Sequence, residues 1–134
     1  MTGYPFCCQI QIRYSDVDAM NHVNNAVYVT YLELARTLLW RERIGYSGSA
    51  REFDFILARV AVDFRSPIDF NDSVEIGVAC TSIGRTSFTL GYRIEASGRL
   101  AAEAESVQVC YDYAAGRPVR APEELRHKLE ALRQ

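Results

Sequence analysis

The chain has 134 residues, of which 49% are hydrophobic and 24% are charged, and its formal net charge is -2 at neutral pH. This length and this mixture predict a single globular domain over residues 1–134 and exclude a disordered or fibrous protein. The charge argues against nucleic acid as a partner, and no apolar stretch reaches the roughly 20 residues that would cross a membrane.

Residues 6–14 alternate between apolar and polar side chains. Ile10, Ile12 and Tyr14 share one side of an extended chain, while glutamine and arginine occupy the other side. This alternation predicts a half-buried strand. Residues 15–24 are rich in Asp, Asn and Ser, which hydrogen-bond to the local backbone, so we expect a loop that leads into a helix.

A long helix is predicted over residues 26–44. Asn24 or Asn25 is a suitable N-cap, the segment contains neither Gly nor Pro, and Gly45 supplies a stop. Apolar side chains cover most of the circumference, so we expect other elements to wrap the helix. The polar residues form one narrow stripe of Thr30, Glu33, Thr37 and Arg41.

Four strands are predicted after the helix, near residues 55–65, 73–83, 86–96 and 100–113. The turn signals SPIDFND, IGRT and ASGR separate them. The third of these runs alternates strictly, as an antiparallel sheet with one covered face requires. We therefore expect the sheet to cover the apolar helix.

The last segment, PEELRHKLEALR, predicts a short closing helix. Pro122 lies near its first position, and Leu125, Leu129 and Leu132 share one face. The order of elements predicts an α+β domain whose sheet folds over one central helix. Because the edges of an open sheet are unpaired, we expect two copies of the chain to associate.

Neither the cysteines nor the histidines form a pattern typical of a metal site or a redox motif. We expect the cysteines to be reduced thiols that fill space; they are Cys7, Cys8, Cys80 and Cys110. The two histidines, His22 and His127, lie far apart in the sequence, so no metal ion and no other cofactor are expected. The start of the chain lacks the order of a secretory signal, which favours a cytoplasmic location.

The polar loop carries the candidate chemistry. Asp18 lies just before the predicted helix, whose unsatisfied N–H groups and dipole stabilise negative charge. A carboxylate there can act as a nucleophile on an acyl carbon or as a general base for water, while N–H groups bind an oxyanion. His22 is a candidate for orienting the substrate carbonyl or the water. The same residue types also form caps and turns, and Asp16 is assigned to the turn.

Three segments resemble the hotdog-fold acyl-CoA thioesterases of the 4-hydroxybenzoyl-CoA thioesterase type. They are RYSDVDAMNHVNNAVYVTYLELAR, LARVAVDFRSPIDFNDSVEIG and SIGRTSFTLGYRI. The resemblance implies a five-stranded antiparallel sheet around a long central helix, with two subunits pairing into a homodimer and commonly again into a homotetramer. It places the essential carboxylate at Asp18 and the active sites between subunits. A backbone N–H near residues 53–56 is then expected to polarise the thioester carbonyl.

The loop also resembles the acyl-ACP thioesterase pattern D-x-D-x-N-x-H-V-N-N. His22, Asn24 and Asn25 match that pattern, which makes His22 a supporting catalytic residue and the two asparagines candidates for substrate binding. Met20 occupies the place of the first Asn of the pattern, and Asn21 follows one residue later. Other members of the acyl-CoA branch have Gly where Asn21 stands.

Further candidates for substrate binding come from the helix and the strands. Tyr28 and Phe55 fit either the acyl pocket or the core. Some members of the family hold the phosphates of CoA with several basic residues before the fourth strand, where this chain has only Arg85. Arg59 and Arg65, from the second strand, are further candidates for that contact.

The resemblance implies an acyl-CoA thioesterase that forms a free acid and CoA, with Asp18 as nucleophile or general base. A non-catalytic acyl-CoA-binding protein and a hotdog hydratase or dehydratase are the alternatives, although the histidine loops of the latter are missing. Glu33 is the other candidate carboxylate, yet its spacing to Arg36 and Thr37 fits a helix-surface interaction. Three alternatives stay open: the identity of the acyl group, whether CoA or an acyl carrier protein is the thiol carrier, and whether the protein is a dimer or a tetramer.

Overall fold

The fold consists of an antiparallel sheet and two α-helices in a computed structural model that describes residues 1–45 and 54–134. The strands are β1 (Phe6–Ile10), β2 (Phe55–Phe64), β3 (Val74–Ile83), β4 (Ser87–Ala96), β5 (Arg99–Asp112) and β6 (Arg117–Pro118), and the helices are α1 (Asn25–Leu39) and α2 (Glu123–Glu130). The predicted α+β architecture is confirmed, and the four strands predicted after the helix agree with β2 to β5 within one residue at each end.

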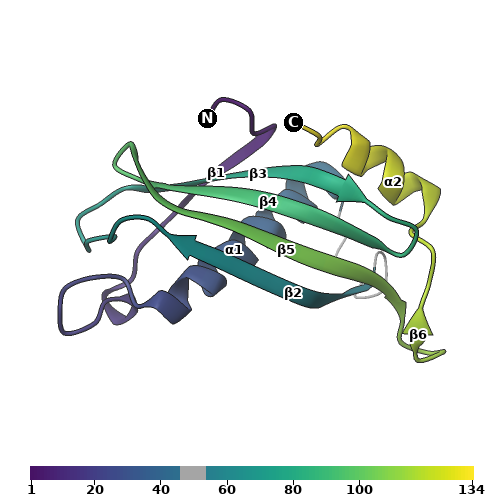
Figure 1. The fold of residues 1–134 in the computed structure, drawn as a ribbon, viewed down its shortest axis with the longest axis horizontal. Helices are drawn as coiled ribbons and strands as arrows, with labels where there is room; N and C mark the ends of the chain where they lie inside the picture. The colour runs from purple at the N-terminus through teal and green to yellow at the C-terminus, as the bar shows by residue number, and fades with distance from the viewer. Residues whose placement is uncertain (46–53) are drawn as a thin grey trace.

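The sheet has the strand order β1-β3-β4-β5-β2, and the two-residue β6 pairs with β5. All of these pairings are antiparallel. The sheet curls around α1, which crosses behind it (Figure 1). Among the described residues β2 pairs with β5 alone, so β2 is an edge strand of ten residues.

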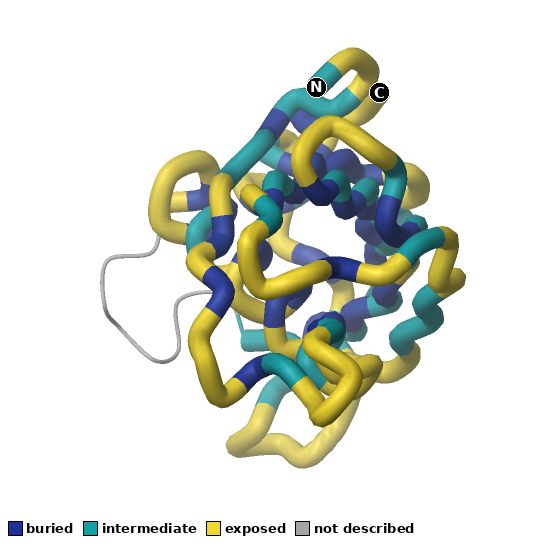
Figure 2. Tube along the Cα trace, turned by 90° about the vertical axis from the view of Figure 1, so that its left-hand side faces the viewer, coloured by how far each residue is buried: buried dark blue, intermediate teal, exposed yellow. Residues whose placement is uncertain are grey.

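Inward-facing side chains of the sheet build the core against α1. The predicted alternation along β4 is confirmed, because Phe88, Leu90, Tyr92 and Ile94 are all buried. In the end-on view of Figure 2, buried and exposed positions alternate along the chain, and exposed loops form the near end of the molecule. These loops include the polar loop before α1.

The central helix is shorter than the predicted long helix. Regular α-helix ends at Leu39, and a π-helical turn over Trp40–Ile44 follows it. Gly45 ends this turn in the left-handed region, with φ of 94°, as its predicted stop requires. The regular part has 15 residues and the turn has 5, which makes a helical segment of moderate length.

Two side chains of α1 differ from the prediction in their burial. Leu34 is 45% exposed because the sheet covers only part of the helix, although the sequence assigned it to the wrapped surface. Arg36 was expected at the surface beside Glu33, yet it is only 6% exposed. Its Nη1 instead donates a hydrogen bond to the hydroxyl of Tyr92 on β4, at 3.2 Å.

The first strand is also shorter than predicted. β1 ends at Ile10, and although Ile12 is still buried, Tyr14 is 84% exposed. Tyr14 begins a 3-10 turn that ends at Asp16, and this turn takes the chain off the sheet. The prediction that Tyr14 lies on the buried side of a strand was therefore wrong.

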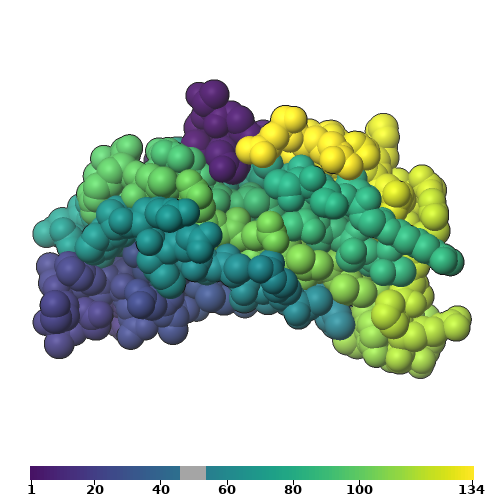
Figure 3. All heavy atoms as spheres, in the orientation of Figure 1, coloured from purple at the N-terminus to yellow at the C-terminus, as the bar shows by residue number. Residues whose placement is uncertain are grey.

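The closing helix packs as predicted. Leu125, Leu129 and Leu132 are buried, and Pro122 is the N-cap of α2 instead of its first residue. The space-filling view shows α2 and the N-terminal segment together along the upper margin of the molecule (Figure 3). The four cysteines are free thiols, as expected, and none of the helices in the described residues is long and apolar enough to cross a membrane.

Candidate active site

The loop before α1 is a tight, hydrogen-bonded turn. Val17 and Val23 form an antiparallel bridge, and the N–H of Asp18 donates to the carbonyl of His22 at 2.8 Å. At the tip, Asn21 has φ of 60°, in the left-handed region where asparagine and glycine are favoured. Asn21 stands where the resemblance places Gly in other members of the acyl-CoA branch. Both residue types tolerate the positive φ that the turn requires here.

The carboxylate of Asp18 is held at one of its two oxygens. Oδ1 accepts hydrogen bonds from the backbone N–H of Met20, at 2.9 Å, and of His22, at 3.3 Å. Within the described residues, no donor is bonded to Oδ2. Asp18 is exposed to solvent, so its carboxylate combines a fixed orientation with one oxygen that is open to a substrate or a water.

Asp18 lies at a cavity of about 310 Å³ between the start of α1 and the end of β2. Loop and helix contribute one wall, and the chain at and beyond the end of β2 contributes the other. The lining residues are Asp18, His22, Val23, Asn25, Tyr28, Phe64, Arg65, Ser66 and Pro67. Five of the predicted candidates are thus brought together: Asp18, His22, Asn25, Tyr28 and Arg65.

His22 faces a carboxylate from the predicted turn SPIDFND, Asp69, which was not among the predicted site residues. Its Nε2 lies 3.5 Å from Oδ1 of Asp69, and the two residues form an antiparallel bridge. The next backbone N–H, that of Val23, donates to the carbonyl of Ile68 at 2.8 Å. The segment 66–72, which the sequence marks only as a turn, therefore positions the histidine.

An ion pair in turn holds the segment 66–72. Nη2 of Arg99 lies 2.6 Å from Oδ2 of Asp72 and also donates to the carbonyl of Pro67 at 2.8 Å. The hydroxyl of Ser97 donates to the other oxygen of Asp72 at 2.9 Å. The bond from Arg99 is the largest cause that lowers the pKa of Asp72, from 3.8 to about 2.

Replacement of Asp72 by asparagine is expected to lower the free energy of unfolding by about 2 kcal/mol at pH 7. Because the folded pKa of Asp72 is depressed, its contribution is present above about pH 4 and is lost as the pH falls through 2. Urea unfolding of the wild type and D72N between pH 7 and pH 2 measures this difference. The exposed Asp63 on β2 provides the control D63N. A constant difference between wild type and D72N across that pH range would contradict the assignment.

The first turn of α1 is capped by Asn24. Its Oδ1 accepts the N–H of Ala26 at 2.9 Å, and its own N–H donates to the carbonyl of Asp16. Asn24 is exposed and is not among the residues that line the cavity, unlike Asn25. The structure therefore gives Asn24 a capping role and places Asn25 at the cavity.

Replacement of Asn24 by alanine is expected to destabilise the protein by about 1 kcal/mol, because the N–H of Ala26 loses its acceptor. N24S and N24D retain a capping oxygen and should stay close to the wild type. Thermal unfolding of the three variants checks this. Equal midpoints for N24A and N24S would show that the cap contributes nothing.

Tyr28 joins the cavity to the core. It is buried, and its ring packs edge-on against Phe64 with 4.9 Å between ring centroids. Burial raises the pKa of Tyr28, while the charge of Arg99 and a hydrogen bond with the backbone of Ile68 offset part of that rise. Its phenol therefore stays protonated at neutral pH and offers an uncharged ring and hydroxyl at the cavity.

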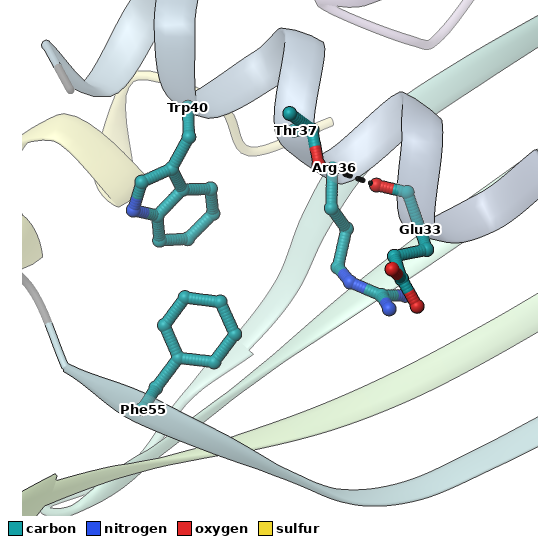
Figure 4. A pocket seen from close by; sticks show the side chains of 5 residues that line it. All are labelled: Glu33, Arg36, Thr37, Trp40 and Phe55. Atoms are coloured by element: carbon teal, nitrogen blue, oxygen red, sulfur yellow. Dashed lines mark hydrogen bonds between the residues drawn. The ribbon is translucent and has the colours of Figure 1, made fainter. Parts of the chain in front are cut away.

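Three other predicted contacts lie away from Asp18. Phe55, at the start of β2, lines a second cavity of about 390 Å³, together with Glu33, Arg36, Thr37 and Trp40. In Figure 4 these four side chains project from α1 toward β2, and Trp40 faces Phe55 across the gap.

Two of the three predicted basic contacts, Arg59 and Arg85, are exposed and lie away from Asp18. Arg59 forms an ion pair with Glu105 at 2.8 Å. Arg85 lies in the turn between β3 and β4, where its carbonyl accepts the N–H of Ala121. Neither lines the cavity of Asp18, whereas Arg65 does, although its Nη2 also lies 3.5 Å from Glu103.

The predicted N–H donor near residues 53–56 falls partly outside the described residues, because Phe53 is not described. The rest of this segment lies at the start of β2, while the cavity of Asp18 lies at the other end of that strand. Within one chain, therefore, the described part of this segment does not meet Asp18.

Comparison with known proteins identifies the family of this chain. The family model of the thioesterase-like superfamily matches residues 12–129. The chain belongs to this superfamily. The predicted kinship with hotdog-fold acyl-CoA thioesterases is confirmed.

Individual members of the thioesterase-like superfamily resemble the chain over most of its length. It is 32% identical over 106 residues to the acyl-CoA thioester hydrolase YbgC of Escherichia coli O6:H1, covering 77% of this chain and 79% of that protein. It is 30% identical over 131 residues to the long-chain acyl-CoA thioesterase FadM of Escherichia coli K12, covering 92% and 96%. A solved thioesterase from Thermus thermophilus, complexed with coenzyme A and Zn, has a TM-score of 0.88 at 36% identity, covering 98% of this chain and 96% of that one.

Metal-ligating side chains are not clustered in the described part of this thioesterase-like chain. No group of three or more His, Cys, Asp or Glu side chains is arranged there to hold a metal ion. His22 and Asp69 form a pair without a third such ligand. The described donor set therefore does not fit a resident metal ion at this cavity.

Proposed function

We propose that this protein is an acyl-CoA thioesterase that hydrolyses an acyl-CoA thioester to a free acid and CoA. The observation that carries the proposal is the convergence of Asp18, His22 and the first turn of α1 on one cavity, in a chain of the thioesterase-like superfamily. The relatives named above as an acyl-CoA thioester hydrolase and a long-chain acyl-CoA thioesterase support the same reaction.

Asp18 supplies the reactive carboxylate in this proposal. As a general base, its free oxygen takes a proton from water while that water attacks the thioester carbon. As a nucleophile, the same oxygen attacks the carbon, CoA leaves as the thiolate, and water then cleaves the resulting anhydride. The open Oδ2 suits either route, and the two hydrogen bonds at Oδ1 hold the group in place for both.

The N-terminus of α1 stabilises the developing oxyanion. The N–H of Asn25 has no acceptor among the described residues, and Asn25 lines the cavity with Asp18. A free N–H at the positive end of a helix dipole is suited to the negative charge that forms on the thioester oxygen. His22, held by Asp69, orients the substrate or the water beside it.

In this proposal, the CoA part of the bound substrate extends from the cavity toward basic side chains. Arg65 is the nearest such group, because it lines the cavity itself. Arg59 and Arg85 are exposed at other places on one chain, and a role for them in phosphate binding depends on how two chains associate. The choice between CoA and an acyl carrier protein as thiol carrier is decided by assay with both.

We also propose that two copies pair through β2. Its outer edge is unpaired in the described residues, and it exposes the apolar side chains Ile56, Leu57 and Phe64. In Figure 3, the start of β2 lies at the lower margin of the molecule, while α1 and the loop before it lie below the end of β2. Antiparallel pairing of two such edges would place the start of one β2 near the end of the other, and so bring residues 54–56 toward the partner's thioester site. Light scattering that found a monomer at micromolar concentration would contradict this pairing.

The proposed location is the cytoplasm, where four free cysteines remain reduced.

Two states of assembly, a dimer and a tetramer, are compatible with pairing at β2.

A thiol-release assay tests the reaction. Purified protein is incubated with aromatic, short-chain and long-chain acyl-CoAs in the presence of a thiol reagent, and we expect release of CoA with at least one class. The relative that is named for long chains makes these acyl groups the first to test. Binding of acyl-CoA without release would instead favour a binding protein, and addition or removal of water on the acyl chain would favour a hydratase or dehydratase.

A further inference from the structure

We infer that the second cavity is a separate binding site for a carboxylic acid with an apolar body, held by Arg36 of α1. Its volume of about 390 Å³ lies within the range of small-molecule sites. The described residues that line it all differ from those that line the cavity of Asp18, so binding here does not require thioester hydrolysis. Only the source of the ligand rests on the proposed function, because the proposed reaction releases acids of this kind.

Arg36 is a buried cation without a counter-ion. It is 6% exposed, and its Nη1 donates to the hydroxyl of Tyr92 at 3.2 Å. Within the described residues, this is the only hydrogen bond of its guanidinium, and no carboxylate lies close enough to form an ion pair with it. Burial raises the pKa of Tyr92, so the phenol stays protonated and does not neutralise the arginine. Because a buried charge is normally paired, Arg36 points to an anion that comes from outside the chain.

The guanidinium of Arg36 is placed to receive that anion in the second cavity. Arg36 is one of the residues that line the cavity. In Figure 4 its guanidinium extends from α1 toward the sheet, and the rings of Trp40 and Phe55 lie on the other side of the cavity. Arginine keeps its charge in proteins and presents five N–H donors in a planar fork that matches the two oxygens of a carboxylate. Since one donor is used by Tyr92, a carboxylate can still accept from two others at once.

The opposite wall of the cavity is aromatic and suits an apolar body. The ring centroids of Trp40 and Phe55 lie 5.1 Å apart. The ring of Phe55 also packs edge-on against the buried Phe88, with 6.0 Å between centroids, which fixes it against the core. Aromatic rings bury large apolar areas against chains or other rings. The cavity therefore combines one cation with an apolar wall, as recognition of an amphipathic acid requires.

Glu33 also lines the cavity, and its charge weakens the binding of an acid without preventing it. Its side chain is exposed, whereas Arg36 is buried. Water and salt screen an exposed charge, while a hydrogen bond between a carboxylate and a buried guanidinium lies in a medium of lower dielectric constant. The attraction to Arg36 therefore exceeds the repulsion from Glu33. Substitution of these two residues is expected to change the affinity in opposite directions.

Intrinsic fluorescence measures the binding, because Trp40 is the single tryptophan of the chain and lines the cavity. The wild type is titrated with octanoate and 4-phenylbutanoate, and with the neutral amides of both acids. We expect at least one acid to change the emission of Trp40 and to bind about tenfold or more tightly than its amide. The two acids show whether an aliphatic or an aromatic body is preferred. CoA, whose anions are phosphates, should not displace the acid, and displacement by CoA would overturn the inference.

Two variants test the role of Arg36. R36M removes the cation but keeps an unbranched side chain, and Tyr92 retains its hydrogen bond of 2.6 Å with Ser106. It should lower the affinity for the acid about tenfold or more and abolish the difference between acid and amide. R41M changes an exposed arginine in the turn after α1 and is the matched control that should bind as the wild type does. E33Q should bind the acid about two- to fivefold more tightly, and it alters an exposed side chain, so the test stays decisive if R36M does not fold.

Two further variants separate this site from the cavity of Asp18. D18N should lose hydrolysis and still bind the acid as the wild type does, and so should R65M, which changes the basic residue of the other cavity. Unchanged binding in R36M, no tighter binding in E33Q, or a loss of binding in R65M would overturn the inference. A wild type that releases thiol but gives no Trp40 response to either acid would overturn it too, while the proposed function would stand. Acid binding without thiol release from any acyl-CoA would instead remove the proposed function and leave this site.

Discussion

Replacement of Asp18 by asparagine is expected to lower kcat for thioester hydrolysis by about 10²- to 10⁴-fold. The amide keeps the shape of the side chain, and its oxygen can still accept the N–H groups of Met20 and His22. It has neither the charge to attack the thioester nor the basicity to take a proton from water. The thiol-release assay measures the loss, and activity within a few-fold of the wild type would contradict the role of Asp18.

The fold of D18N should be unchanged, since Asp18 is exposed and its contacts are local. Equal far-UV circular dichroism and thermal midpoints for D18N and the wild type check this. D63N, which changes an exposed carboxylate on β2, should retain full activity. A comparable loss of activity in D63N would mean that the assay responds to net charge instead of to the reactive group.

A single turnover in water labelled with heavy oxygen can identify nucleophilic attack by Asp18, because only an anhydride that is hydrolysed at the Asp18 carbonyl puts the label into the protein. Attack by Asp18 followed by hydrolysis at its own carbonyl leaves labelled oxygen in the peptide that contains this residue. Direct attack by water leaves the protein unlabelled and places the label in the acid. Mass spectrometry of the protein and of the product acid detects the label in each.

Local sequence patterns predicted the α+β class and the order of the main elements. Alternation in β4 placed Phe88 and Leu90 in the core, and the positive φ of Gly45 ended the helical segment where the sequence indicated. The errors occurred where a distant contact overrides a local pattern. Arg36 has the spacing of a helix-surface residue, yet its partner Tyr92 lies 56 positions later in the chain, so helical periodicity could not place it in the core.

The candidate site was predicted in the part that is contiguous in sequence. Asp18, His22 and Asn25 lie within one turn and the start of one helix, so their proximity follows from the chain itself. Asp69 reaches the same region through the pairing of segments far apart in the sequence, and so does Arg65, which was predicted as a phosphate contact but not as a neighbour of Asp18. The Pro and Asp residues of SPIDFND indicated a turn. They did not indicate which residues that turn contacts.

Replacement of Asp16 by asparagine is expected to lower the free energy of unfolding by about 2 to 4 kcal/mol. Asp16 is 1% exposed and accepts hydrogen bonds from the backbone N–H and the guanidinium of Arg13 and, at 2.7 Å, from the hydroxyl of Tyr31. An amide would turn its NH₂ group toward at least one of these donors and leave it without an acceptor. Urea unfolding at pH 7 measures the loss.

The pH dependence and a double-mutant cycle show whether the buried carboxylate is responsible. Burial by itself raises the pKa of Asp16, but the hydrogen bonds from Arg13 and Tyr31 more than offset it, and the net pKa lies below 3.8. Its contribution is therefore present above about pH 4 and is lost as the pH falls through the folded pKa, so wild type and D16N should converge in acid. Y31F removes only the phenol hydroxyl and should lose about 1 kcal/mol, and D16N with Y31F should lose less than the sum of the two changes. Strict additivity, or a difference between wild type and D16N that persists in acid, would mean that the ionised Asp16 does not hold the turn in front of Asp18.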